Sequence, residues 1–225
     1  MNRFLIIAGL AAVLVPGVSD AADEQKEHFV IALRLPEWTS MHFDDPATAQ
    51  QHAAAVKKLG AEVRVEQHNG HTDVSYRTSG WKALRVETDE LAHTWEDWLK
   101  RAGFETLHGH NPDHAEHAHH TDHDHEHANE HAEVVLVRTP DWVSQHVQDR
   151  DTASDLVVIA EALRCEVQQG EHADHVDVRF RCPEWTAVEF PSHEAATSWM
   201  KWLKSSGFEV RHEHGATDSH AGHNH

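Results

Sequence analysis

An internal repeat is the feature that most constrains how this chain can fold. Residues 28–110 align with residues 132–214 at an offset of 104 without a gap, and 30 of the 83 aligned positions are identical. All eight tryptophans occur in matched pairs, as Trp38 with Trp142 and Trp95 with Trp199 do. This extent of matching in a fixed register predicts two copies of one structural unit. Each copy has about 80 residues, which is enough for a small domain.

Local signals in the first copy predict a succession of strands and helices. Pro36 ends an apolar run, Asp45-Pro46 combines an N-cap with a first-turn proline, and Thr88 and Gly103 cap a second helix at its two ends. Strands are predicted at residues 30–35, 61–68, 71–78, 82–86 and 104–110, and helices at residues 45–59 and 88–102. The order fits an α+β fold, a tandem repeat of two small ferredoxin-like domains of the β-α-β-β-α-β type.

A hairpin turn fixes the register of the two central strands. Asn69-Gly70 lies between alternating stretches and favours a two-residue type I′ turn, so His68 should face His71. Asp73 then lies diagonally next to His68, and the second copy repeats the arrangement. Imidazole and carboxylate are ligands that zinc accepts. The predicted metal ligands of the two hairpins are His68, His71 and Asp73, and His172, His175 and Asp177.

The same register places the two cysteines of the chain opposite each other. Cys165 faces Cys182 in a non-hydrogen-bonded pair, for which Cα atoms about 4.5 Å apart are expected. That separation allows a disulfide. The first copy has Ala61 and Thr78 at these positions, so both cysteines are absent there together. Two buried thiols or a soft metal site are the alternative interpretations, and the apolar surroundings disfavour the metal site.

Two histidine-rich segments, residues 108–131 and 212–225, follow the two copies. A disordered spacer needs polarity but not ten histidines in twenty-four residues, whereas histidine interleaved with Asp and Glu offers many overlapping ligand sets. The sequence therefore predicts labile sites for Zn²⁺, or for Ni²⁺, Cu²⁺ or Co²⁺. The ligands predicted in these segments are His108, His110, His114, His117, His119, His120, His123, His125, His127, His131, His212, His214, His220, His223 and His225.

Composition and the N-terminal residues bear on location and partners. The net charge of −19 disfavours nucleic acid and anionic membranes as partners and is compatible with cations. Arg3, the apolar run at residues 4–18 and the small residues after it are typical of a secretory signal. We therefore expect a periplasmic or secreted protein that is not embedded in the membrane. The predicted organisation is a signal peptide at 1–22, repeat domains at 28–107 and 132–211, a linker at 108–131 and a tail at 212–225.

These features favour an exported protein that sequesters, buffers or delivers a transition metal, most readily zinc, with a metal transporter or other envelope protein as a further partner. Signatures of common enzymes, such as His-Glu-x-x-His, are missing from the sequence, so no catalytic residue is predicted. One alternative is a protein-interaction module with a metal- or pH-responsive tether. The other is a metal-dependent hydrolase built on the hairpin ligands. His42 and His146 are expected to be ordinary surface or partly buried side chains, and the tryptophans to be core residues.

Overall fold

The computed structural model describes residues 29–112 and 133–213. The predicted signal peptide, most of the linker and most of the tail lie outside these residues. The first half contains β1 (Phe29–Arg34), β2 (Thr39–Phe43), α1 (Pro46–Lys58), β3 (Glu62–His68), β4 (His71–Arg77), β5 (Lys82–Val86), α2 (Asp89–Arg101) and β6 (Glu105–Leu107). The second half contains β7 (Glu133–Val147), α4 (Arg150–Ala162), β8 (Glu166–Glu171), β9 (Val176–Phe190), α5 (His193–Ser205) and β10 (Glu209–Glu213).

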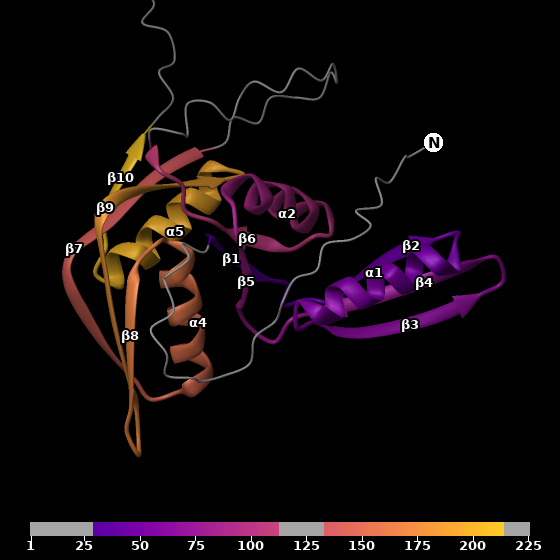
Figure 1. Cartoon of the computed structure of the whole chain (residues 1–225), viewed down its shortest axis with the longest axis horizontal. Coiled ribbons are helices and arrows are strands. Elements are labelled where there is room, and N and C mark those ends of the chain that lie inside the picture. The colour runs from indigo at the N-terminus through magenta and orange to yellow at the C-terminus, as the bar shows by residue number, and fades with distance from the viewer. Residues whose placement is uncertain (1–28, 113–132, 214–225) are drawn as a thin grey trace, which may run out of the picture.

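The architecture is α+β, as the sequence predicts (Figure 1). In the second half the strands form one antiparallel sheet in the order β10-β7-β9-β8. Both helices of each half begin 104 residues apart in the two halves, and the predicted N-caps Asp45 and Thr88 accept hydrogen bonds from the first turns of α1 and α2. That the halves are copies of one domain stays a prediction from the sequence.

The first half divides the corresponding strands between two sheets, β5-β1-β6 and β2-β4-β3. The break occurs at Pro36, which has no N–H to donate to a ladder, and at Gly80, whose φ is 148°. Just before the break, the Thr78 N–H donates to the Leu35 carbonyl at 2.7 Å. In the second half the strand continues through Pro140 with register shifts between Val137 and Val143, so β7 bends where its counterpart breaks.

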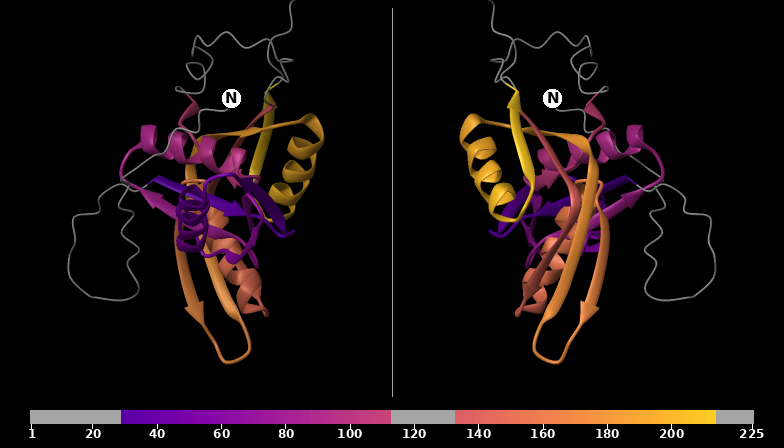
Figure 2. Two further views of the ribbon diagram at one scale, coloured as in Figure 1. Left: turned by 90° about the vertical axis from the view of Figure 1, so that its right-hand side faces the viewer. Right: turned by 90° about the vertical axis from the view of Figure 1, so that its left-hand side faces the viewer.

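The two halves share a hydrophobic core. Helix α4 lies between its own sheet and strands β1 and β5 of the first half (Figures 1 and 2). Ala32, Trp81 and Leu107 of the first half are buried in one cluster with the residues of α4. The Trp81 N–H also donates to the Asp155 carboxylate at 2.9 Å. The halves therefore pack as one unit, from which the two long hairpins, β3–β4 and β8–β9, extend in different directions.

The predicted hairpin registers are confirmed. His68 pairs with His71 and Glu62 with Arg77 in the first half, and Glu166 pairs with Arg181 in the second. Strand β2 was missed, because its five residues follow the first strand so closely that they read as a loop. Within the described residues, no helix reaches the length and apolarity needed to cross a membrane.

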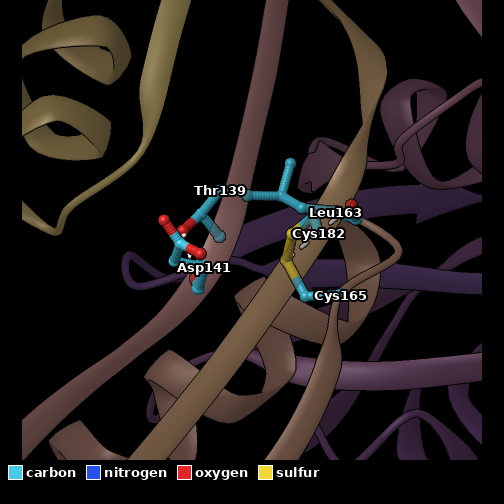
Figure 3. The surroundings of a disulfide bond; sticks show 5 residues. All are labelled: Thr139, Asp141, Leu163, Cys165 and Cys182. Atoms are coloured by element: carbon cyan, nitrogen blue, oxygen red, sulfur yellow. Dashed lines mark hydrogen bonds between the residues drawn. A yellow bond between two sulfur atoms is a disulfide. The ribbon is translucent and has the colours of Figure 1, made fainter.

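The predicted disulfide between Cys165 and Cys182 is present, with Cα atoms 4.4 Å apart (Figure 3). Both cysteines are buried, at the point where β8 begins beside the middle of β9. The bridge joins the two strands of the long hairpin at its base, next to the core shared with the first half. It therefore fixes the end of the hairpin opposite to the histidine-bearing turn.

The disulfide can be tested with residues that the chain itself provides. The double variant Cys165→Ala/Cys182→Thr copies the pair at Ala61 and Thr78 of the first half. It should lose roughly 2–4 kcal/mol of unfolding free energy, because the unfolded chain is no longer cross-linked. Denaturant unfolding measures the loss, and the reduced wild-type chain is the control. A difference below about 0.5 kcal/mol would contradict a stabilising bridge.

A buried histidine in α1 predicts an acid sensitivity of the fold. The ring of His52 lies 5.1 Å from that of Tyr76 and 5.5 Å from that of Trp98, and burial lowers its pKa from 6.5 to about 4. The neutral form is therefore favoured in the folded chain, and this contribution to stability is lost as the pH falls from about 6.5 to about 4. The variant His52→Leu copies Leu156, the equivalent residue of α4.

In thermal unfolding, the melting temperature of the His52→Leu variant should fall less between pH 7 and pH 4.5 than that of the wild type. The variant and the wild type should differ little at pH 7. Equal losses of melting temperature in the two proteins would show that His52 titrates normally in the fold.

Candidate metal centres

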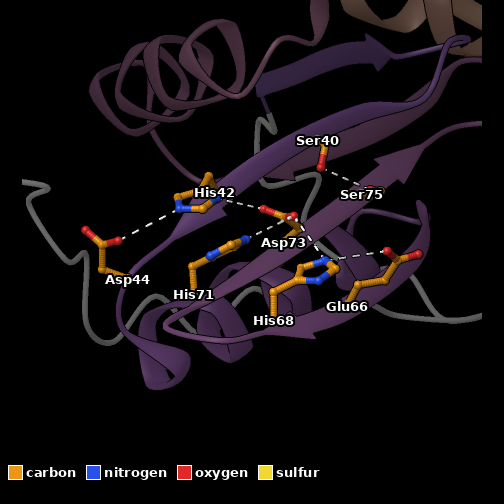
Figure 4. Close-up of polar contacts among 8 residues, drawn as sticks. All are labelled: Ser40, His42, Asp44, Glu66, His68, His71, Asp73 and Ser75. Atoms are coloured by element: carbon orange, nitrogen blue, oxygen red, sulfur yellow. Dashed lines mark hydrogen bonds and ion pairs between the residues drawn. The ribbon is translucent and has the colours of Figure 1, made fainter.

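Three histidines surround one carboxylate on the outer face of the β2-β4-β3 sheet. Asp73 is directly opposite His42 across the β2–β4 ladder, and the His42 Nδ1 lies 2.9 Å from the Asp73 Oδ1. The His68 Nε2 is 3.5 Å and the His71 Nε2 3.8 Å from the Asp73 Oδ2. Figure 4 shows the three imidazoles converging on the carboxylate from β2, β3 and β4. We call this the first open cluster.

The alternation of β4 explains why these side chains share a face. Thr72, Val74 and Tyr76 point into the core and are buried, so His71 and Asp73 must point outward. The hairpin register adds His68 from β3, and strand β2 adds His42 from the other side. The predicted set of His68, His71 and Asp73 is thus brought together by the structure.

The second half has an equivalent second open cluster around Asp177. His146 makes a short hydrogen bond to the Asp177 Oδ1, the His172 Nε2 lies 3.2 Å from Oδ2, and the His175 Nε2 lies 3.4 Å from Oδ1. Burial alone would raise the pKa of Asp177, but the hydrogen bond from His146 and the nearby imidazoles hold it below the ordinary value. Both open clusters are therefore built around an ionised carboxylate.

The spacing of these ligand atoms suits a tetrahedral ion. Bonds of 2.0–2.1 Å to zinc place ligand atoms about 3.3 Å apart. The ligand atoms of His42, His71 and Asp73, and those of the equivalent three residues in the second half, all lie within 4.8 Å of one another. His68 and His172 contact the same carboxylates from the β3 and β8 sides. Each open cluster can therefore offer three or four ligands after small side-chain rotations.

The expectation that His42 and His146 are ordinary surface histidines is corrected by these contacts. Each is directly opposite the central aspartate of its cluster. The signal that could have found them is the alternation of Met41 and Phe43, which turns His42 to the other face once residues 39–43 are read as a strand. Because β2 was missed in the sequence, this signal was missed with it.

His108 and His110 lie in the folded part of the chain, not in the linker where the sequence analysis placed them. They are only 2% and 7% exposed, and their ring centroids are 4.5 Å apart. Burial lowers the pKa of His110 to about 4, so its ring is neutral near pH 7. His93 and Asp89 of α2 lie beside them, and the His93 and His110 rings are stacked at 4.7 Å. We call these four residues the junction cluster.

A fourth cluster is located at the corresponding place in the second half. The His212 Nε2 lies 2.6 Å from the Glu133 Oε2, and the His193 Nδ1 lies 3.6 Å from the Glu133 Oε1. His212 was predicted as a ligand of the tail but belongs to β10, whereas Glu133 and His193 were not predicted. The other predicted ligands of the linker and tail, from His114 to His131 and from His214 to His225, lie outside the described residues.

The comparisons with known proteins do not place the chain in a family. No protein-family model matches it, and no curated protein matches it significantly. A solved structure described as a putative glycine cleavage system transcriptional repressor covers 83% of this chain and 95% of its own, at 11% identity and a TM-score of 0.17. A likeness at this level carries no argument about fold or function.

The link between His146 and Asp177 can be tested directly. The variant His146→Ala removes the hydrogen bond that keeps the pKa of Asp177 low, so that pKa should rise towards or above its ordinary value. A carboxyl-carbon NMR titration measures the change. The variant His42→Ala, in the other half, is the control and should leave Asp177 unchanged. An Asp177 pKa that stays low in His146→Ala would mean that the two side chains do not interact in solution.

Proposed function

We propose that this protein is exported and captures a transition metal ion, which it buffers or hands over in the cell envelope. The observation that carries the proposal is the pair of open clusters, in which one carboxylate is ringed by three imidazoles in each half. Zinc fits this ligand set best, and nickel, copper and cobalt are the alternatives, because imidazole suits all four ions.

Exposure supports capture and release as the role of the open clusters. The side chains of His42 and His146 are 56% and 74% exposed, and the clusters lie on the open faces of two hairpins. An ion bound there keeps contact with water and with a competing ligand, so it can exchange. The histidine-rich segments would add labile sites between and after the two halves, raising the local concentration of metal.

Two further observations are compatible with export. The disulfide between Cys165 and Cys182 is of a kind that persists in oxidising compartments. The apolar run at residues 4–18 has the length and flanks of a signal peptide. A periplasmic or secreted location is therefore part of the proposal.

The rival functions have less support. A hydrolase needs a pocket over its metal, and the cavity lined by Arg34, Glu62, Arg77 and Asp155 lies away from every described histidine cluster. An interaction module was expected to expose an apolar sheet face. Among the described residues Val65, at 48%, is the large apolar side chain that is exposed, which falls short of a patch. A partner that receives the metal stays part of the proposal.

Zinc titration by calorimetry tests the open clusters. The starting protein is a chain in which the twelve histidines of residues 113–131 and 214–225 are serine, which we call the Ser background. Asp73→Asn/Asp177→Asn in this background should abolish two zinc sites per chain that have Kd values below about 1 μM, or about −8 kcal/mol. The neutral amide keeps the shape of the side chain but loses the charge at the centre of each cluster.

A matched pair of substitutions controls for the change in charge. Asp44 lies 3.8 Å from the His42 Nε2 and Asp174 lies 2.8 Å from the His175 Nδ1, but neither carboxylate is at the centre of a cluster. Asp44→Asn/Asp174→Asn should leave both sites intact. If the two double variants bind the same amount of zinc as the Ser background, the open clusters are not metal sites and the proposed function fails.

A further inference from the structure

The segment that follows β6 joins the two halves through its backbone. β6 belongs to the sheet of the first half, but two residues later the chain pairs with the second. The Gly109 N–H donates to the Ala162 carbonyl at the end of α4 at 2.9 Å, and His110 exchanges both backbone hydrogen bonds with Ala187 of β9 at 2.8 and 2.9 Å. His110 thus extends the edge of β9 beyond the reach of β8.

Gly109 shows how closely the two halves approach at this point. A Cβ atom there would lie 2.4 Å from the Thr186 side chain and 2.9 Å from the Ala162 carbonyl, so no larger residue fits without a shift. His108 and His110 flank this glycine, and their imidazoles are the buried part of the junction cluster. Whatever holds these two rings therefore also holds the strand that connects the halves.

Both buried rings present a nitrogen that lacks a protein partner. The His108 Nδ1–H donates to the Val30 carbonyl at 2.9 Å, which leaves Nε2 as the free nitrogen. Within the described part of the chain, the His108 Nε2 and the His110 Nδ1 are buried and accept or donate no hydrogen bond. A backbone carbonyl that fixes one ring nitrogen while the other is left open is the usual environment of a histidine that binds a metal.

Asp89 and His93 complete the set from the first turns of α2. The Asp89 Oδ1 lies 3.6 Å from the His108 Nε2, and the Asp89 Oδ2 lies 3.5 Å from the His93 Nε2. Ligand atoms of Asp89, His93 and His110 lie within 4.8 Å of one another. These separations are near the roughly 3.3 Å expected between ligands of tetrahedral zinc. The distance of 3.6 Å is too long for a hydrogen bond, so Asp89 does not satisfy His108.

We propose that Asp89, His93, His108 and His110 form a structural site for a transition metal ion that fastens the two halves of the protein together. Four protein ligands, two of them buried, leave no open position, which is the arrangement of structural and not exchangeable zinc sites. The inference does not rest on the proposed function, because the junction site can be filled whether or not the open clusters bind metal.

The test measures zinc-dependent thermal unfolding of the Ser background after dialysis against a chelator. Adding zinc at about one hundred times the Kd should raise the melting temperature by roughly 5–10 °C. His93→Thr, which copies Thr197 of α5, should keep the fold without metal and lose most of this shift, because His93 is exposed and serves only as a ligand. Cobalt in place of zinc should give the intense visible absorption of a tetrahedral site in the Ser background and lose it in His93→Thr.

The variant His71→Ser separates this inference from the proposed function. It removes a ligand of the first open cluster and should leave the zinc-dependent shift and the tetrahedral cobalt spectrum unchanged. If His93→Thr keeps the full shift, or if the shift disappears in His71→Ser, the junction cluster is not the structural site. If Asp73→Asn/Asp177→Asn leaves zinc binding unchanged while His93→Thr loses the shift, the proposed function fails and the junction site stands.

Discussion

The burial of α4 on two sides is the constraint on which the rest of the structure depends. Its counterpart α1 has one packed face, where Ala49 and Val56 are buried. Helix α4 buries the equivalent positions and also Leu156, Ile159 and Ala162, since strands β1 and β5 of the first half cover its second face. The shared core fixes the two halves relative to each other, and it brings residues 109 and 110 against the end of α4 and the edge of β9.

Part of this arrangement could be predicted from the sequence. The Asn69-Gly70 turn determined a register that then placed His68, Asp73, Cys165 and Cys182 correctly, because side chains alternate strictly along a strand. The packing of the halves was missed, although one signal was present. Aligning the halves puts His52, in a polar helix, opposite Leu156, in a nearly continuous apolar run, and only a helix covered on both faces needs such a run.

The burial of His108 and His110 could not be read from the local sequence. Both lie at the start of a run of histidines and acidic residues, which is typical of a solvated segment. What buries them is the edge of β9, a strand that begins more than sixty residues later. Similar ligands therefore have different surroundings at the junction and in the open clusters. At the junction, orphaned ring nitrogens favour a permanently bound ion. In the open clusters, exposure favours exchange.

Charge connects these sites to the rest of the chain. Each open cluster has one ionised carboxylate among neutral imidazoles, so a bound divalent ion leaves a local charge of about +1 that must be balanced nearby. The formal net charge of −19 supplies the balance, and carboxylates such as Glu66, 3.8 Å from the His68 Nε2, stand next to the ligands without crowding them. A strongly negative surface also raises the concentration of cations around it. The acidic composition and the histidine clusters thus favour the same ligand, a small divalent cation, by two separate physical routes.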